Sequence, residues 1–463
     1  MKLKQHLIPV LIFTAIALLF LAACLIPMIR SDYASAVPEA LQMFMVNFLC
    51  LYIVYAGILF LNHFVAPDKT MMTMSFLLMT LLLQSGNSVS LPLLEYVSGR
   101  ELSEATGMAQ DYLKYTIIFL GSSAFSMGLM AAAPAILLRK QKVTVILSGV
   151  MNLILAGILF VFHGDYGTTT IADIQVGLPI LAYMLVIFAF YWHVFLNSRS
   201  NTRQYFPRHP KLAAGLHYLS LVLLLGSYMA SGEFGIPFFF VMACVFWTLT
   251  YSDLKWWKRL IPALVCGGAI GAMLTFYKKV YEPLDAEGRK GLGLVGNLCA
   301  KLHDRVFELA PQSQTAIERV HSAGLFGAMD YRLLGEARTD FSIATNTHFL
   351  GGVWLVILLL MIGAVAVFSN MFFRKHRDVR RMNILPSLGL TQIFCLCLWN
   401  IISNLGLIGV VGVSCYASGY GKTVYILSGM LFGFVMYPTD INRLLFKGKS
   451  GKTRKTKKEA VNV

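Results

Sequence analysis

Long apolar runs constrain this chain more than any other feature of its sequence. About twelve stretches of roughly 18 or more residues carry few charges, and a run of that length can cross a bilayer as a helix. The runs are continuous, without the apolar–polar alternation of a transmembrane β-barrel. Only 13% of the residues are charged, about half the usual share in soluble domains, which excludes a soluble fold. The sequence therefore predicts an all-α, polytopic transmembrane helical bundle.

The predicted spans follow the limits of these apolar runs. They cover residues 7–29, 41–65, 71–94, 115–138, 143–163, 174–196, 213–231, 234–252, 260–277, 347–371, 386–409 and 424–446. The run 71–94 is the weakest of them, because the polar stretch Gln84–Asn87 interrupts it. Leu21–Cys24 is similar to a lipoprotein cleavage box, but the residues after Cys24 remain apolar, so we expect an uncleaved first helix.

The net charge of +16 is gathered in short segments beside the apolar runs. These segments are Arg139–Lys142, Arg199–Lys211, Lys255–Arg259, Arg374–Arg381 and the tail 447–463. Such a distribution follows the positive-inside rule, so we expect these segments and both termini to be cytoplasmic. It also argues against nucleic acid as a partner, because the charge is not concentrated in one polar domain.

The segment 278–345 is the one sizeable polar insertion in the sequence, and we expect it to lie outside. The polar residues near its end suit a substrate that carries phosphate groups, since guanidinium groups match phosphate oxygens and glycine permits close backbone approach. They are Arg319, Ser322, Gly324, Arg332, Arg338 and Thr339. Asp340 follows, close to the apolar run Phe349–Phe368, which we expect to be one spanning helix. A carboxylate there can act as a general base at a water–lipid interface, although an isolated acid–base pair is more often an ordinary surface charge.

Four short motifs, taken in order, resemble the SEDS family of the FtsW/RodA/SpoVE type. Two are strong: Ser322–Gly327 (SAGLFG) with Thr339-Asp340-Phe341, and the closing series Gln392, Asn400, Asn404, Gly412-Val413 and Tyr420-Gly421. Two are weaker: Gln175, and Glu233-Phe-Gly235. Together they cover roughly residues 140–440.

The resemblance implies a division of the chain and an activity. A ten-span family core would correspond to residues 111–446, with residues 1–110 as about two additional helices and 447–463 as a basic cytoplasmic tail. The implied activity is polymerisation of lipid II, a polyprenyl-pyrophosphate-linked disaccharide-peptide, in the bacterial plasma membrane. A class B penicillin-binding protein is the implied partner, and a divalent cation, Mg²⁺ or Mn²⁺, is a candidate cofactor.

The resemblance also implies roles for individual residues. Asp340 becomes the general base for the acceptor hydroxyl, and the substrate-binding candidates are Arg338, Thr339, Arg332, Arg319, Ser322, Gly324, Gln175, Glu233, Tyr420 and Lys422. The chain departs from the family pattern where Leu178 replaces an acid, His348-Phe349 replaces a pair of acids and Lys422 replaces a glycine. These departures leave two alternatives open: a flippase for a lipid-linked sugar, and a catalytically silent scaffold of a cell-wall complex.

Overall fold

The computed structural model describes most of the predicted bundle. The described residues are 2–99, 102–137, 168–171, 174–177, 235–251, 255–303, 311–329, 341–375, 380–408 and 414–437, with scattered positions between 146 and 226. The predicted spans 143–163 and 213–231, most of 174–196, and the tail 447–463 lie outside the residues that the structure describes continuously. The number of twelve spans and the division at residue 110 therefore stay predictions.

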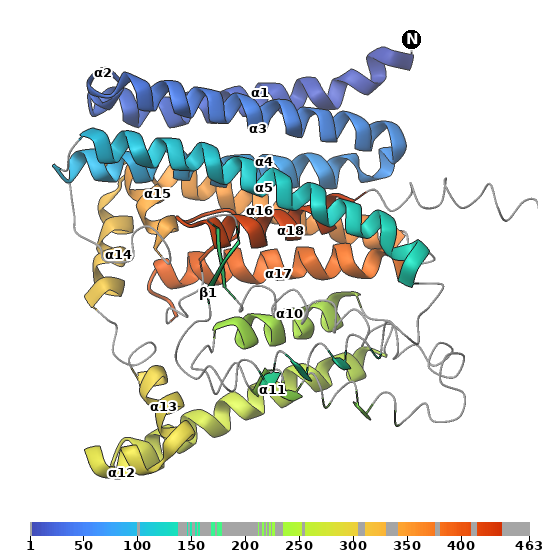
Figure 1. The fold of residues 1–463 in the computed structure, drawn as a ribbon, viewed down its shortest axis with the longest axis vertical. Coiled ribbons are helices and arrows are strands. Elements are labelled where there is room, and N and C mark those ends of the chain that lie inside the picture. The colour runs from blue at the N-terminus through green and yellow to red at the C-terminus, as the bar shows by residue number, and fades with distance from the viewer. Residues whose placement is uncertain are drawn as a thin grey trace, which may run out of the picture.

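Helices make up nearly all of the described chain (Figure 1). The long ones are α1 (Lys2–Arg30), α3 (Pro38–Val65), α4 (Thr70–Val97), α5 (Leu102–Leu137), α10 (Gly235–Tyr251), α11 (Trp256–Phe276), α16 (Gly352–Lys375), α17 (Arg380–Asn404) and α18 (Lys422–Met436). The short ones are α2 (Tyr33–Ala36), η1 (Pro67–Lys69), the π-helix η2 (Tyr277–Tyr281), α12 (Ala286–Gly291), α13 (Gly293–Leu302), α14 (Pro311–Ser322) and α15 (Ser342–Leu350).

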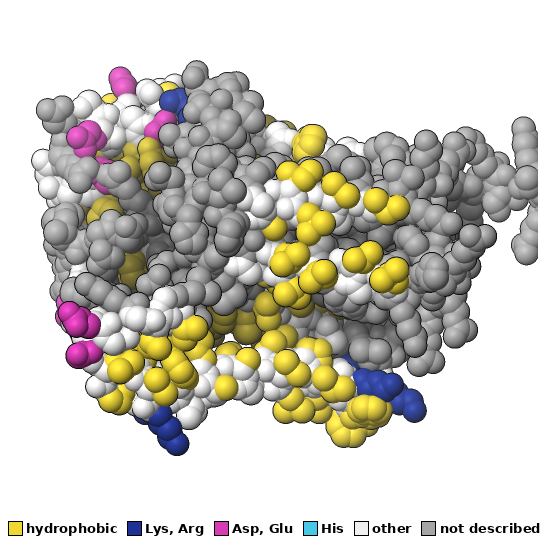
Figure 2. Space-filling model, turned by 60° about the horizontal axis from the view of Figure 1, so that its bottom comes forward, with side chains coloured by type: hydrophobic (Ala, Val, Ile, Leu, Met, Phe, Trp, Pro, Cys, Tyr) yellow, Lys and Arg dark blue, Asp and Glu magenta, His cyan; other side chains and the backbone are white. Residues whose placement is uncertain are grey.

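The predicted fold class is confirmed: the protein is a helical membrane bundle. Six of the described helices are long and apolar enough to cross a membrane, and two shorter apolar helices accompany them. Hydrophobic side chains cover the middle of the face shown in Figure 2, while the coloured acidic and basic side chains lie toward its two sides. That arrangement is typical of a bundle whose helix lengths lie in lipid and whose helix ends meet water.

A small antiparallel hairpin corrects one predicted boundary. Strand β1 (Thr168–Ile171) pairs with strand β2 (Ile174–Gly177), and Thr170 lies opposite Gln175. The span predicted over 174–196 therefore does not begin as a helix at Ile174. The apolar residues at 174–177 fit the start of a spanning helix as well as they fit a strand, because a short apolar run does not distinguish the two.

Contacts between distant segments define one end of the bundle. The Arg30 guanidinium at the end of α1 donates to the carbonyl of Phe326 at 3.0 Å. The Tyr420 hydroxyl, just before α18, donates to Asp111 near the start of α5 at 2.6 Å. The end of α1 and the start of α5 lie on the same side in the predicted topology as the segment 278–345 and the turn before α18.

The opposite ends of the helices meet in the same way. Lys375 at the end of α16 forms an ion pair with Asp68 at 3.0 Å. The buried Lys69 ammonium donates to the carbonyls of Val435 and Tyr437, where α18 ends, at 3.0 and 3.2 Å. A cation there complements the negative end of the helix dipole. The contacts at both ends agree with the predicted alternation of spans.

The helix predicted least firmly, α4, lies at the centre of the bundle. It packs against α1, α3, α5, α15 and α16 (Figure 1). All residues of its apolar 18-residue stretch are buried inside the protein. The polar stretch Gln84–Asn87 faces protein rather than lipid, since all four residues are buried. Polar residues are tolerated in this span because they are buried against neighbouring helices, where they find hydrogen-bond partners.

The spanning helix predicted over Phe349–Phe368 is present, but it begins three residues later, which corrects a second predicted boundary. Helix α15 ends at Leu350, and α16 begins at Gly352. Between them Gly351 has a φ of 89°, a conformation that breaks an α-helix and is accessible mainly to glycine. The apolar pattern continues across this break, so hydropathy alone could not reveal it.

Helices α5 and α18 lie in close contact along glycines of α18. A Cβ at Gly429 would collide with the hydroxyl of Ser122, and a Cβ at Gly433 would lie 2.5 Å from the carbonyl oxygen of Ser123. Small residues four positions apart let two membrane helices approach at the backbone. This close contact holds α18 against the middle of α5, and the Tyr420–Asp111 hydrogen bond holds the turn before α18 near the start of α5.

Candidate functional site

The turn after α14 pairs with the break between α15 and α16. The Gly352 amide donates to the carbonyl of Gly324 at 2.8 Å. The Val353 amide donates to Leu325 at 3.2 Å, and the Ala328 amide donates to His348 at 2.7 Å. The structure thus joins the Ser322–Gly327 motif to the end of α15.

Glycine is required on both sides of this junction. Gly327 has a φ of 83°, and a Cβ there would collide with the carbonyl oxygen of Phe349. A Cβ at Gly351 would collide with the carbonyl oxygen of Leu325. At Gly327 and Gly351 the chain's own backbone makes the close approach, and the approach of a substrate to Gly324 stays a prediction.

Helix α14 brings Arg319 and Ser322 to this junction. Arg319 is completely buried, and its carbonyl lies 3.4 Å from Nδ1 of His348 on α15. The Ser322 hydroxyl donates to the Arg319 carbonyl at 3.2 Å. A buried guanidinium carries a large desolvation cost and is held where charge is needed.

Five of the predicted site residues lie outside the described part of the chain. They are Glu233, Arg332, Arg338, Thr339 and Asp340. The described chain resumes at Phe341, which is only 3% exposed. All nine residues of the following helix α15 are buried. In the sequence, the predicted base is thus followed by a short buried helix, and the spanning helix begins only at Gly352.

Helix α15 is held by polar contacts inside the bundle. Asn404 on α17 accepts a hydrogen bond from the Ala344 amide at 2.8 Å. The Asn346 amide group donates to Oδ1 of Asn87 on α4 at 2.9 Å. Five of its nine residues, Ser342 and Thr345–His348, are polar and at most 1% exposed. A polar helix at this depth is expensive in a membrane protein and tends to serve function.

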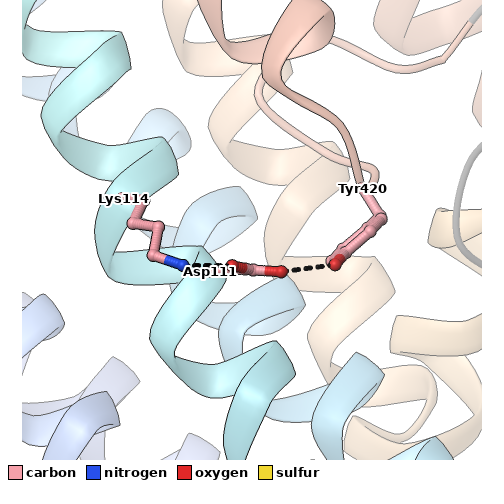
Figure 3. Close-up of polar contacts among 3 residues, drawn as sticks. All are labelled: Asp111, Lys114 and Tyr420. Carbon is pink, nitrogen blue, oxygen red and sulfur yellow. Dashed lines mark hydrogen bonds and ion pairs between the residues drawn. The ribbon is translucent and has the colours of Figure 1, made fainter. Parts of the chain in front are cut away.

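A second charged group lies on the start of α5 (Figure 3). Asp111 accepts hydrogen bonds from the Tyr420 hydroxyl at 2.6 Å and from the Lys114 ammonium at 2.9 Å. Partial burial, the largest single influence, would raise the pKa of Asp111. The hydrogen bonds from Tyr420 and Lys114, with the charges of Lys114 and Lys422, outweigh it and lower the pKa of Asp111 below its ordinary value.

The two family-derived candidates Tyr420 and Lys422 therefore lie beside Asp111, while Gln175 lies in strand β2. Neither Asp111 nor Asn87 was a candidate from the sequence. Asn87 could have been found from its position, because a polar interruption inside a span marks a buried contact. Asp111 could not, because its partner Tyr420 is 309 residues away.

Metal ligands are not gathered in the described part of the chain. Among those residues, no three His, Cys, Asp or Glu side chains lie close enough to hold a metal ion. The divalent cation implied by the resemblance stays a prediction.

Comparisons with known proteins give little independent support. No protein-family model matches the sequence, and no curated protein is similar to it. One similar solved chain comes from "Structural coordination of polymerization and crosslinking by a peptidoglycan synthase complex". It is 16% identical with a TM-score of 0.43, and the match covers 84% of this chain and 97% of that one. A similarity of this size leaves the function to be argued from the residues.

Proposed function

We propose that this protein is a membrane glycosyltransferase that polymerises a polyprenyl-pyrophosphate-linked cell-wall precursor, lipid II, into glycan strands. The observation that carries the proposal is the meeting of three motif-bearing segments at one end of the bundle. They are the Ser322–Gly327 turn, helix α15 directly after Asp340-Phe341, and the turn containing Tyr420.

The proposed reaction needs a base and a cationic surrounding at that end. The acceptor hydroxyl oxygen attacks the anomeric carbon of the donor sugar, and the bond from that carbon to the pyrophosphate breaks. Asp340 takes the hydroxyl proton, and the pyrophosphate leaves on its polyprenyl lipid with inversion at the anomeric carbon. Arg338 and Arg332 stabilise the charge that grows on the leaving group, and the buried Arg319 adds its positive charge from inside the protein.

The surrounding structure supports a site that receives a lipid-linked substrate. Helix α15 brings a polar backbone and polar side chains into the bundle, where protein contacts satisfy them. The lipid tail of such a substrate would remain beside apolar helices while its phosphates reach the polar end. A class B penicillin-binding protein is the partner that this activity would need for crosslinking.

Polymerisation from lipid II by the purified protein tests the proposal. We expect Asp340→Ala to reduce chain growth by about 10³-fold, within the range for loss of general-base catalysis, while the melting temperature stays within a few degrees of wild type. Asp285→Ala is the matched control, because this exposed carboxylate lies in the same polar segment and caps only the local Gly288 amide. Polymerisation at wild-type rates by Asp340→Ala would contradict the proposal. Inactive wild-type protein, even with a penicillin-binding protein present, would favour the scaffold.

A flippase is the second candidate, and the buried polar residues of α4 favour it. Gln84, Ser85, Asn87, Ser88 and Ser90 are all buried within this central helix, and polar residues in the interior of a bundle can line a substrate path. Translocation of lipid II in proteoliposomes at the same rate in wild type and Asp340→Asn, without glycan formation, would establish this function instead.

A further inference from the structure

One amide in the middle of α4 joins two segments that are far apart in the sequence. Oδ1 of Asn87 accepts a hydrogen bond from the Asn346 amide group at 2.9 Å and lies 3.1 Å from the Ser418 hydroxyl. All three side chains are completely buried. Asn346 belongs to α15, and Ser418 belongs to the non-helical segment 414–421 that precedes α18.

A third contact connects the two segments directly. The Ser418 hydroxyl lies 3.0 Å from the Ser342 hydroxyl at the start of α15. Because the Ser418 hydroxyl carries one proton, it donates to either Asn87 or Ser342 at any moment, and both acceptors lie within hydrogen-bond distance. Asn87, Ser342, Asn346 and Ser418 therefore form one hydrogen-bonded network, which we call the Asn87 network.

Both segments carry candidate functional residues close to this network. In the sequence Asp340 stands two residues before Ser342, and Tyr420 stands two residues after Ser418. Tyr420 in turn donates to Asp111 at the end of the bundle. The network thus fixes both segments to a single position on α4.

The local structure makes α4 a suitable fixed point. A Cβ at the neighbouring Gly86 would lie 3.1 Å from Nε1 of Trp354 and 3.3 Å from a methyl group of Leu350, so α4 lies in close contact with the α15–α16 junction. The Asn87 amide group also faces the hydroxyl of Tyr425 on α18. A leucine would fill a similar volume without any of these polar contacts, so packing alone does not account for an asparagine here.

We propose that Asn87 is a positioning residue for the glycosyl-transfer site, holding the segment after Asp340 and the segment before Tyr420 in register with each other. This inference rests on the proposed function. Sites are held in productive geometry by buried hydrogen bonds behind the reacting groups, and a displacement of about 1 Å can cost about 10²-fold in rate. Asn87 acts through these segments and does not touch the substrate.

The test compares Asn87→Leu with Gln84→Leu in the lipid II polymerisation assay. Gln84 is the matched control: it is a buried amide one turn earlier on α4, and its Oε1 accepts a hydrogen bond at 2.7 Å from Tyr55 of α3, which belongs to neither segment. We expect kcat to fall by about 30- to 100-fold in Asn87→Leu and by less than about 3-fold in Gln84→Leu, with similar losses in melting temperature. Equal losses of kcat in the two variants would overturn the inference.

Two further variants separate positioning from a general loss of structure. Asn87→Asp keeps an acceptor oxygen at the same place, so it should recover most of the activity that Asn87→Leu loses. In the Asp340→Ala background, Asn87→Leu should cause no further loss, because two groups that act through one step are not additive. A full additional loss in that background would contradict the positioning role.

The outcomes also distinguish this inference from the function on which it rests. Full activity in Asp340→Ala overturns the proposed function and the inference with it. Loss of activity in Asp340→Ala with wild-type activity in Asn87→Leu overturns the positioning role alone. Should Asn87→Leu fail to fold, Ser418→Ala replaces it, with Ser85→Ala as control because Ser85 donates to the Leu81 carbonyl of its own helix. A loss of kcat in Ser418→Ala beyond that of Ser85→Ala supports the role, and equal values contradict it.

Discussion

Helices α4 and α11 are both apolar enough to span a membrane, yet they occupy opposite positions in the bundle. The apolar 18-residue stretch of α4 has a mean hydropathy of 1.4, and 100% of it is buried inside the protein. The corresponding stretch of α11 has a mean hydropathy of 1.8, and only 6% of it is buried. In Figure 1, α11 lies at the lower edge of the molecule and α4 lies among the other helices. The less hydrophobic helix is therefore the central one.

The difference teaches that hydropathy identifies a span but does not locate it. Lipid tails are as apolar as leucine side chains, so no hydrophobic force drives an apolar helix into the centre of the bundle. Polar side chains do favour a central position, because they need hydrogen-bond partners that lipid does not offer. In α4, Gln84 and Asn87 find theirs on α3 and α15.

The largest effect should come from filling a close helix contact. Gly433→Leu forces a side chain against the Ser123 carbonyl and Ser126 of α5. We therefore expect the free energy of unfolding to fall by about 3 kcal/mol or more, at the upper end for overpacking. Gly271→Leu on α11 is the control, because nothing lies within 4 Å of a Cβ there. Melting temperatures in detergent measure both, and equal stability of the two variants would refute the close contact.

A smaller loss of stability should follow from truncating a buried side chain of α4. Leu83 on α4 is completely buried, whereas Leu264 on α11 is 71% exposed. We expect Leu83→Ala to destabilise the protein by about 2 kcal/mol, since a cavity and lost packing contacts remain as costs inside the bundle. Leu264→Ala should change stability by less than about 0.5 kcal/mol. Thermal unfolding of the two variants in the same detergent decides whether burial separates these helices.

The smallest effect concerns the exposed end of the bundle and depends on pH. The pKa of Asp111 is lowered in the folded protein, so its contribution to stability is present above the ordinary carboxyl pKa of about 4 and is lost as the pH falls through the lower, folded value. We expect wild type to lose melting temperature more steeply than Asp111→Asn below about pH 4. Parallel pH profiles for the two proteins would contradict this account. Tyr420→Phe should reduce the wild-type slope because it removes one of the two hydrogen bonds to Asp111.

The sequence was sufficient for the fold class. Long apolar runs predicted the spans, and most described helices begin or end within a few residues of them. The Ser322–Gly327 motif was recognised in the sequence, and in the structure backbone hydrogen bonds join it to the start of α16. Glycine at such places is a local requirement of the backbone, which is why it is visible in a sequence.

Long-range contacts could not be predicted from one sequence. The break at Gly351 was missed because apolar residues continue on both sides of it. The contact between Asp111 and Tyr420 spans 309 residues, and the contact between Asn87 and Asn346 spans 259. Neither leaves a local pattern, so the network that surrounds the candidate site became apparent only from the packed bundle.

The central claim is that an ionised Asp340 removes the proton from the acceptor hydroxyl. The most direct measurement is the rate of glycan chain growth from lipid II by purified wild type, Asp340→Ala and the control Asp285→Ala, followed by gel analysis of the products. The account predicts long chains with wild type and the control, and a loss of about 10³-fold with Asp340→Ala at unchanged melting temperature. Chains of wild-type length and rate from Asp340→Ala would contradict it.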